Sequence, residues 1–202
     1  MRKFDLAIFA AVILFPTSFI LRATPRSGLA GRLAASQSAT STAASVVKPQ
    51  AYVSLEPVPR ARTFSVAVVA EIARGFHINS NKPLDEFLIP TTLTAQLPAG
   101  FREIETVYPA GQLLKFAFSP DKPLSVYSGS AMFRMKFEAA ADAPLGSQTI
   151  PLTLRYQPCN DTACLPPVKV PVVVKLEVAA ADAKARPIHP EIFTTSGAKP
   201  LN

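Results

Sequence analysis

Two cysteines are the residues of this sequence best suited to chemistry, because only four residues separate them. Cys159 and Cys164 lie in the stretch Tyr156-Gln-Pro-Cys-Asn-Asp-Thr-Ala-Cys-Leu-Pro-Pro167. Two thiols this close in sequence can pair in an oxidising compartment. Such a bridge could be a structural staple, or it could open and close in thiol–disulfide exchange, which requires a sulfur that an attacking thiolate can reach.

The short spacing favours the second use without excluding the first. Closing a loop of six residues removes only about 2 kcal/mol of denatured-state entropy, so a staple would gain more from joining distant segments. A metal site is a weaker alternative, because the two cysteines with a distant His77 or His189 do not form a familiar zinc-ligand spacing. We therefore expect no metal and no cofactor, and a metal-delivery module using His77 stays as a third possibility.

The elements around the cysteines are predicted to be strands. Four segments alternate apolar and polar residues with a period of two, which is typical of half-buried strands; they are residues 63–70, 131–138, 150–157 and 168–178. Weaker strand candidates are residues 51–55, 91–97, 101–107 and 113–118. Turn-forming residues separate them at 98–100, 109–111, 119–123 and 142–146.

About eight short strands at this spacing, without a convincing helix, predict an all-β, immunoglobulin-like antiparallel β-sandwich. The two cysteines fall between two of the stronger strands, so we expect them at a hairpin end on the rim of the sandwich. The sequence has no phosphate-binding glycine loop, βαβ unit or Gly-x-Ser-x-Gly elbow. Dinucleotide enzymes, P-loop enzymes and α/β-hydrolases are thereby excluded.

The N-terminus indicates export from the cytoplasm. Arg2 and Lys3 precede an unbroken apolar run from Leu6 to Phe15, which extends less regularly to Leu21. Residues 1–22 are therefore predicted to be a cleaved signal peptide or an uncleaved signal anchor. If residues 4–21 stay as an anchor in the inner membrane, the basic residues before them orient the body toward the periplasm.

Charge and composition divide the rest of the chain. Residues 23–50 are rich in Ala, Ser and Thr, which predicts a flexible linker. The domain is expected at residues 51–178 and a disordered tail at residues 179–202. The formal charge of the chain is +7, but residues 50–178 carry only +1. A nucleic-acid-binding domain needs a basic face, so we expect no nucleic-acid partner.

Several motifs of the predicted domain together resemble the N-terminal periplasmic (alpha) domain of the DsbD family of thiol:disulfide interchange proteins. The resemblance runs from about residue 51 to 178, and its most specific part is the cysteine stretch. The motifs are Gly75-Phe-His-Ile-Asn79, Leu88-Ile-Pro-Thr-Thr92, Tyr108-Pro109, Tyr127-Ser-Gly129 and Tyr156 to Pro167.

The resemblance implies a cysteine pair that relays electrons outside the cytoplasm. The family takes them from a membrane-embedded thiol relay and passes them to thioredoxin-fold partners, a protein-disulfide reductase activity that also serves cytochrome c assembly. We expect a monomer that contacts the membrane only through its N-terminal segment. The alternative is a non-catalytic β-sandwich interaction or assembly module with a structural disulfide.

The resemblance also assigns site residues. Cys159 and Cys164 would be the redox pair, with Cys164 first to join a partner. Tyr127, Ser128 and Gly129 would form a cap loop whose aromatic ring shields the disulfide. His77 and Asn79 stand where tyrosines near the cysteines are familiar, and a protonated imidazole at position 77 would lower a cysteine pKa.

One departure from the family concerns the electron donor. Full-length members continue into a multi-span membrane domain and a thioredoxin-like domain with Cys-x-x-Cys, whereas this sequence ends at Asn202. The expectation is therefore that the electron donor is supplied in trans by another protein.

Overall fold

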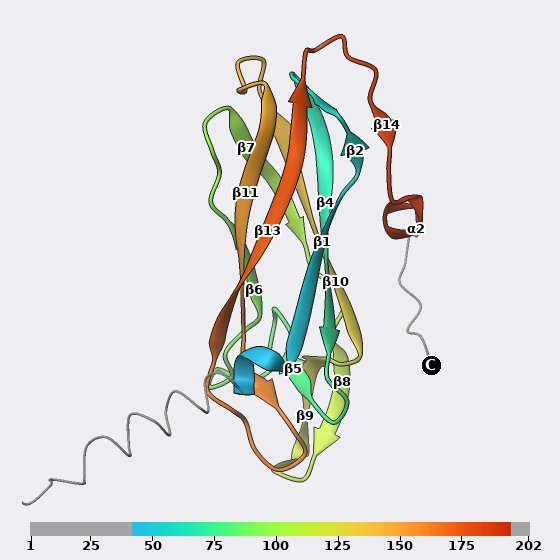
Figure 1. Ribbon diagram of the computed structural model, residues 1–202. Helices are drawn as coiled ribbons and strands as arrows, with labels where there is room; N and C mark the ends of the chain where they lie inside the picture. Colours follow the sequence, from blue (N-terminus) through green and yellow to red (C-terminus); the bar gives the residue numbers. More distant parts are fainter. Residues whose placement is uncertain (1–41, 195–202) are drawn as a thin grey trace, which may run out of the picture.

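The computed structural model describes residues 42–194, whose regular elements are almost all strands (Figure 1). A helical turn at residues 42–45 precedes the first strand. The elements that follow are β1 (Val47–Val53), β2 (Leu55–Glu56), β3 (Val58–Pro59), β4 (Arg62–Ile72), β5 (His77–Asn79), β6 (Thr92–Ala95), β7 (Phe101–Val107), β8 (Gln112–Phe116), β9 (Ser119–Tyr127), β10 (Ser130–Ala139), β11 (Gly146–Tyr156), β12 (Pro158–Cys159), β13 (Val168–Ala179), β14 (Arg186–Pro187) and α2 (Pro190–Phe193).

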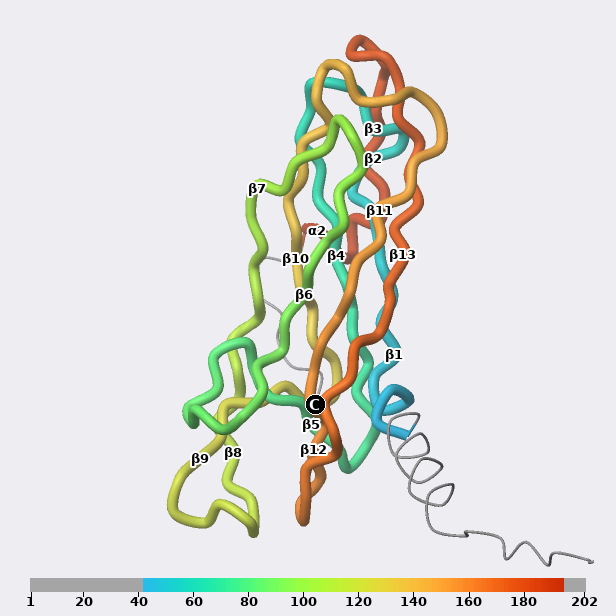
Figure 2. Tube along the Cα trace, turned by 90° about the vertical axis from the view of Figure 1, so that its left-hand side faces the viewer, coloured from blue at the N-terminus to red at the C-terminus, as the bar shows by residue number. Residues whose placement is uncertain are grey.

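Two four-stranded sheets form the body of the molecule. One has the order β1-β4-β10-β7 and the other β3-β13-β11-β6 (Figures 1 and 2). Their buried side chains form one core cluster. A third sheet, β12-β5-β9-β8, lies at the lower end in Figure 1. The predicted all-β, immunoglobulin-like sandwich is therefore confirmed.

The period of two in the sequence accounts for the core. Along β10, Phe133, Met135 and Phe137 are buried while their neighbours are less so, and β11 and β13 alternate in the same way. Because alternate side chains of a strand point to opposite faces, each strand contributes one apolar face to the core. The four strongly alternating segments all lie in strands, β4, β10, β11 and β13.

The ordered body begins earlier than residue 51. β1 starts at Val47, and both Val46 and Val47 are buried. The hydroxyl of Tyr156 in β11 donates a hydrogen bond to the carbonyl oxygen of Ala43, 3.0 Å away. The short apolar pair inside an Ala/Ser/Thr-rich stretch thus packs into the core, so residues 47–50 are strand and not linker. Most of the linker and all of segment 1–22 lie outside the described residues.

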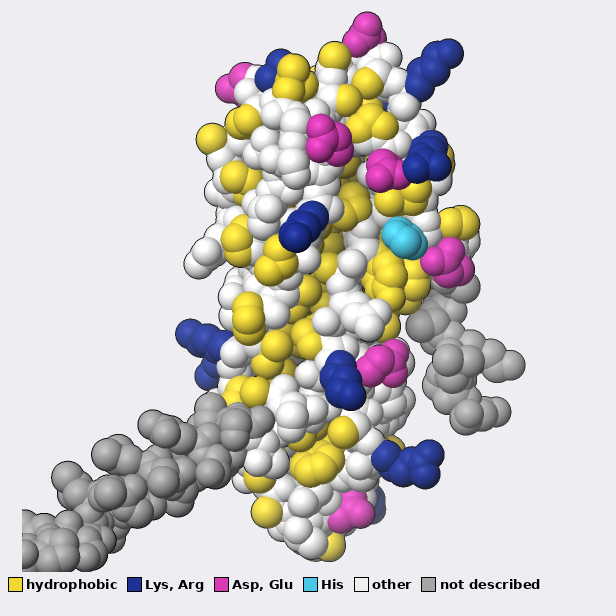
Figure 3. Space-filling view, in the orientation of Figure 1, with side chains coloured by type: hydrophobic (Ala, Val, Ile, Leu, Met, Phe, Trp, Pro, Cys, Tyr) yellow, Lys and Arg dark blue, Asp and Glu magenta, His cyan; other side chains and the backbone are white. Residues whose placement is uncertain are grey.

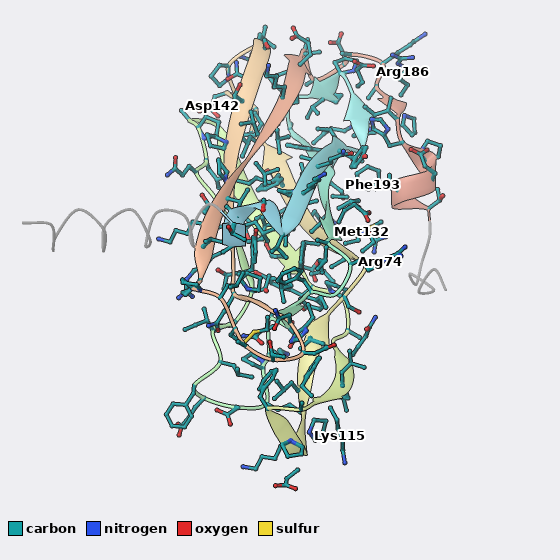
Figure 4. All side chains as sticks on the ribbon, turned by 60° about the horizontal axis from the view of Figure 1, so that its bottom comes forward. Arg74, Lys115, Met132, Asp142, Arg186 and Phe193 are labelled. Atoms are coloured by element: carbon teal, nitrogen blue, oxygen red, sulfur yellow. A yellow bond between two sulfur atoms is a disulfide. The ribbon has the colours of Figure 1, made fainter. Side chains whose placement is uncertain are left out.

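The segment expected as a disordered tail contains regular structure as far as it is described. β13 ends at Ala179, and the chain then turns back so that β14 pairs with β2 (Figure 1). Arg186, labelled in Figure 4, forms an ion pair with Glu56, and the His189 ring lies edge-on to Tyr52 at 5.1 Å between centroids. These contacts with β1 and β2 hold a segment whose sequence has no apolar period.

A predicted turn is also replaced by strand. Residues 119–123 contain two prolines, yet they form the first half of β9. The turn is instead at residues 117–118, between β8 and β9. Pro120 and Pro123 are tolerated because they fall at the register shift of the hairpin, between the paired positions Phe116–Ser119 and Leu114–Leu124. A proline that is not required to donate a ladder hydrogen bond can lie in such a strand.

Among residues 42–194, no helix is both long enough and apolar enough to cross a membrane.

Candidate functional site

The two cysteines are bonded to each other at the lower end of the molecule. β11 ends at Tyr156, β12 carries Cys159, and β13 begins at Val168, so the pair lies in the β11–β13 connection as predicted. Cys159 and Cys164 form a disulfide with 3.9 Å between their Cα atoms. Cys159 is fully buried, whereas Cys164 is exposed. Only one sulfur-bearing residue of the pair therefore faces solvent.

Asn160 closes the loop between the cysteines. Its side-chain oxygen Oδ1 accepts hydrogen bonds from the Thr162 amide (3.0 Å), the Thr162 hydroxyl (2.9 Å) and the Ala163 amide (2.9 Å). The Asn160 amide in turn donates to the carbonyl oxygen of Ala163 at 2.9 Å. This arrangement is a side-chain turn of the kind that Asn favours. It holds the two cysteine backbones side by side by hydrogen bonds as well as by the disulfide.

His77 lies directly beside the buried cysteine. In the β12–β5 pairing, Cys159 is opposite His77, and Cys159 also bridges to Cys164 on its other side. Residues directly opposite in an antiparallel pair have Cβ atoms about 4.5–5.5 Å apart on the same face of the sheet. His77 is only 3% exposed, and its Nε2 atom is buried without a hydrogen-bond partner. The prediction that placed His77 near the cysteines thus agrees with the strand register.

Two phenylalanines stack beyond His77. The Phe116 ring lies parallel to the imidazole, with 4.0 Å between centroids, and the Phe118 ring stacks on Phe116 at 5.5 Å. Burial lowers the pKa of His77 from its usual value, and the nearby Asp161 carboxylate only partly opposes this effect. The imidazole is therefore neutral at neutral pH.

Asn79 connects β5 to two neighbouring segments beside the site by hydrogen bonds. It is fully buried, and its Nδ2 donates to the carbonyl oxygen of Ile89 (3.0 Å) and to Oε1 of Gln157 (3.3 Å). Its Oδ1 is buried without a partner. Because it is two residues from His77 on the same strand, its side chain lies on the same face as His77 and Cys159.

Tyr127 lies on the other face of this sheet. It is opposite Ile78, which is in turn opposite Pro158, so all three alternate with His77 and Cys159. The Tyr127 ring packs edge-on against Phe133 in the core, 5.6 Å between centroids. This register differs from the shielding expected of Tyr127, since its ring leaves the sheet on the face away from Cys159. The ring stacked on the cysteine-side histidine is that of Phe116.

The rest of the expected cap loop forms the turn between β9 and β10. The Ser128 hydroxyl donates to Oε1 of Gln112 at 2.8 Å. Gly129 has a φ of 70°, a left-handed conformation that glycine adopts without strain, and its carbonyl oxygen accepts the Ile72 amide at 2.7 Å. Both residues join neighbouring strands of the lower end, and neither contacts a cysteine through a hydrogen bond of the described residues.

Large apolar side chains are exposed around the cysteine end; we call them the apolar rim. They belong to the segment between β5 and β6 and to the β8–β9 hairpin, which lie at the same end of the molecule (Figure 2). Hydrophobic side chains are visible at this lower end in the space-filling view of Figure 3. Phe87 is 83% exposed. The members of the apolar rim are Leu84, Phe87, Leu113, Leu114 and Phe118. Exposed apolar groups gathered in this way are typical of a surface that binds another protein.

The arrangement provides two-electron chemistry at an exposed cysteine. Figure 4 looks toward this end, where the disulfide lies inside the loop and Lys115 marks the β8–β9 hairpin. A disulfide stores two oxidising equivalents in the S–S bond itself, and its exchange requires only an approaching thiolate. Within residues 42–194, no three His, Cys, Asp or Glu side chains are grouped so as to hold a metal ion.

Sequence reasoning overlooked Asn160, Phe116 and Phe118. The pattern Asn-x-Thr directly after a cysteine is a recognisable side-chain turn signal. The Phe-Ala-Phe spacing of 116–118 would put two rings on one face of a continuous strand, although in the structure residues 117–118 form the turn after β8. Nothing in the sequence shows that this face meets His77.

One protein-family model matches most of the described part of the chain. The family model described as "Thiol:disulfide interchange protein DsbD, N-terminal" matches residues 43–175. No curated protein matches the chain.

Solved structures with a similar fold are distant in sequence. The reduced DsbD N-terminal domain of Neisseria meningitidis is 17% identical, with a TM-score of 0.40, covering 67% of this chain and 88% of that one. The complex of the DsbD and PilB N-terminal domains from the same organism gives 17% identity, a TM-score of 0.39, and coverage of 61% and 80%. The N-terminal periplasmic domain of ScsB from Proteus mirabilis gives 11% identity, a TM-score of 0.41, and coverage of 63% and 46%.

Proposed function

Because the chain belongs to the family of DsbD N-terminal domains, we propose that it is an exported thiol–disulfide interchange domain, a protein-disulfide reductase that acts through protein partners. Cys159 and Cys164 are its redox pair. The observation that carries this proposal is the asymmetry of the pair: Cys164 is exposed, at the same end of the molecule as the apolar rim (Figure 2), whereas Cys159 is fully buried. Exchange requires one cysteine that an attacking thiolate can reach, and a second cysteine at bonding distance can then resolve the mixed disulfide.

The proposed reaction balances without a cofactor. In the reduced domain, the Cys164 thiolate attacks a disulfide of the partner, so a Cys164–partner bond forms and the partner's S–S bond breaks. Cys159 then attacks Sγ of Cys164, the Cys159–Cys164 bond forms, and the partner leaves as a dithiol. Two electrons and two protons pass to the partner. The reverse sequence of steps, with a membrane-embedded thiol donor supplied in trans, reduces the Cys159–Cys164 disulfide again.

The surroundings of the pair support a protein as the reaction partner. The apolar rim offers exposed side chains such as Phe87 and Leu113 for docking. A DsbD N-terminal domain of Neisseria meningitidis has been solved in complex with a PilB N-terminal domain. We propose thioredoxin-fold proteins as the partners of this chain, and cytochrome c assembly as a pathway that the reaction serves.

We further propose a periplasmic location. The N-terminal basic and apolar residues support export, and residues 4–21 would supply the anchor if they are retained. These residues lie outside the described part of the chain. The segment rich in Ala, Ser and Thr that follows would let the domain reach partners near the membrane.

Trapping of a mixed disulfide tests the proposed function. In Cys159→Ser the exposed Cys164 keeps its thiol but cannot be released by its neighbour, so it should accumulate a covalent complex with a thioredoxin-fold protein that carries an oxidised Cys-x-x-Cys. Cys164→Ser keeps only the buried thiol and should trap much less. Both proteins are separated by non-reducing electrophoresis.

A structural staple predicts a different result. Both variants would then be destabilised equally, and neither would form a complex that a reductant dissolves. That outcome would replace the exchange function with that of a non-catalytic interaction or assembly module.

A further inference from the structure

Three residues form a row across neighbouring strands at the cysteine end. His77 is opposite Cys159 in the β5–β12 pairing, and Cys159 is bridged to Cys164. Side chains that are directly opposite one another share a face of the sheet. The imidazole therefore lies on the side of Cys159 that is away from the exposed cysteine. It borders the residue from which the reaction proposed above must take a proton in its second step.

Two buried polar atoms on this face have no partner in the oxidised protein. They are Nε2 of His77 and Oδ1 of Asn79, which lie two residues apart on β5. Leaving such buried atoms unpaired is unfavourable, because they have lost their hydrogen bonds to water. A disulfide has no S–H group to offer them, whereas a reduced cysteine has one. Reduction of the pair thus creates an S–H group on the residue opposite His77, whose Nε2 the oxidised form leaves unsatisfied.

We propose that His77 is the proton acceptor for Cys159 when the mixed disulfide with a partner is resolved. This inference rests on the proposed function and assigns a catalytic residue to it. Nε2 of the neutral imidazole takes the thiol proton of Cys159, and the resulting thiolate attacks Sγ of Cys164. The Cys164–partner bond breaks, and the partner's departing thiolate takes up the proton from the imidazolium. Protons and electrons balance within the complex.

The charges around His77 suit a neutral acceptor. The cysteine loop contributes the Asp161 carboxylate, whose charge acts on the imidazole, and β8 contributes the apolar ring of Phe116. From β9, the ionisable Tyr127 lies on the opposite face. Burial outweighs the effect of Asp161 and lowers the pKa of His77. A neutral imidazole has one nitrogen that can accept a proton, whereas both nitrogens of the protonated form already carry one.

The reaction of the reduced domain with Ellman's reagent separates the two steps. Cys164 releases the first thionitrobenzoate at a rate proportional to reagent concentration. Attack of Cys159 on the Cys164 adduct releases the second, at a rate that is independent of reagent concentration. Both releases are followed by absorbance after rapid mixing. The variants are His77→Phe, which keeps the stack on Phe116, and His77→Gln, which keeps an acceptor that cannot take the proton.

The matched control is His189→Phe. His189 is the other histidine of the chain, and it packs against Tyr52 near the C-terminal segment instead of the cysteines. It should leave both steps unchanged. An unchanged rate of the first step also shows that the His77 variants retain their fold at Cys164.

We expect the second step to slow in both His77 variants at pH 7. An ordinary cysteine of pKa about 8.5 is only about 3% ionised at that pH, so the loss can reach about 30-fold. The difference should disappear near pH 10, where Cys159 ionises without help. A second step that is unchanged at pH 7, or slowed equally at every pH, would overturn the proposal. Either result would leave the trapping of partners by Cys159→Ser intact, so failure of this inference is distinguishable from failure of the proposed function.

Discussion

The Asn160→Ala substitution should make the cysteine pair more oxidising. The Asn160 side chain accepts three hydrogen bonds that hold the loop closed. Without them, the reduced loop gains conformations that the disulfide must exclude. Exposed hydrogen bonds lie at the low end of about 0.5–1.5 kcal/mol each, so we expect a total of about 1–2 kcal/mol. At about 30 mV for 1.4 kcal/mol, the reduction potential becomes about 20–40 mV less negative.

The assay is equilibration of wild type and variant in graded thiol buffers, followed by alkylation and mass spectrometry. Asn160→Asp serves as the control, because its carboxylate oxygen can accept the same hydrogen bonds, and its potential should stay near that of the wild type. An Asn160→Ala potential that is unchanged or more negative would refute the view that this side chain organises the reduced loop.

Three further predictions test other parts of the structure. Tyr156→Phe should lower the free energy of unfolding by about 1–2 kcal/mol in urea titration, since two backbone carbonyls lose their hydroxyl donor. Gly100→Ala should lower the melting temperature more than Gly75→Ala, although both glycines have a φ near 80°. A Cβ at residue 100 would be 2.4 Å from Cα of Ala143, whereas one at residue 75 meets nothing within 4 Å. Equal melting temperatures of the two variants would contradict this. Because burial lowers the pKa of His77, its contribution to stability is full above the unfolded value of about 6.5 and is lost as the pH falls through the lower folded value. His77→Phe should therefore lose less stability than the wild type between pH 7 and pH 5, as measured by denaturant titration.

The long strands were predictable because their apolar period is set by burial of one face. The alternation in residues 131–138 and 168–178 identifies β10 and β13 to within one or two residues. β5 is too short to show any period, since its three residues are all buried. β9 was not predicted because Pro120 and Pro123 indicate a turn. Their turn preference is overridden because other residues of β9 pair with β8.

The site was predictable only in its covalent part. The spacing of Cys159 and Cys164 indicates a disulfide whatever the fold. The position of His77 near the cysteines was predicted only from the resemblance to the DsbD family. The Phe116 stack depends on a hairpin that folds back over β5, which is a tertiary contact without a local pattern. The face on which Tyr127 lies depends on strand register, and a shift of one residue reverses it.

The ends of the domain show the same limit. Val46 and Val47 are two apolar residues in a polar stretch, too few to display a period, yet they are buried because β1 pairs with β4. The Arg186 ion pair with Glu56 joins residues far apart in sequence. Contacts of this kind order a segment that composition alone assigns to a tail.

The reduction potential of the Cys159–Cys164 pair tests the account most directly. The protein would be equilibrated in graded thiol buffers, alkylated and weighed by mass spectrometry. The proposed exchange function predicts a potential between about −180 and −270 mV, the range of known exchange proteins. A potential below about −300 mV, typical of structural disulfides, would contradict it.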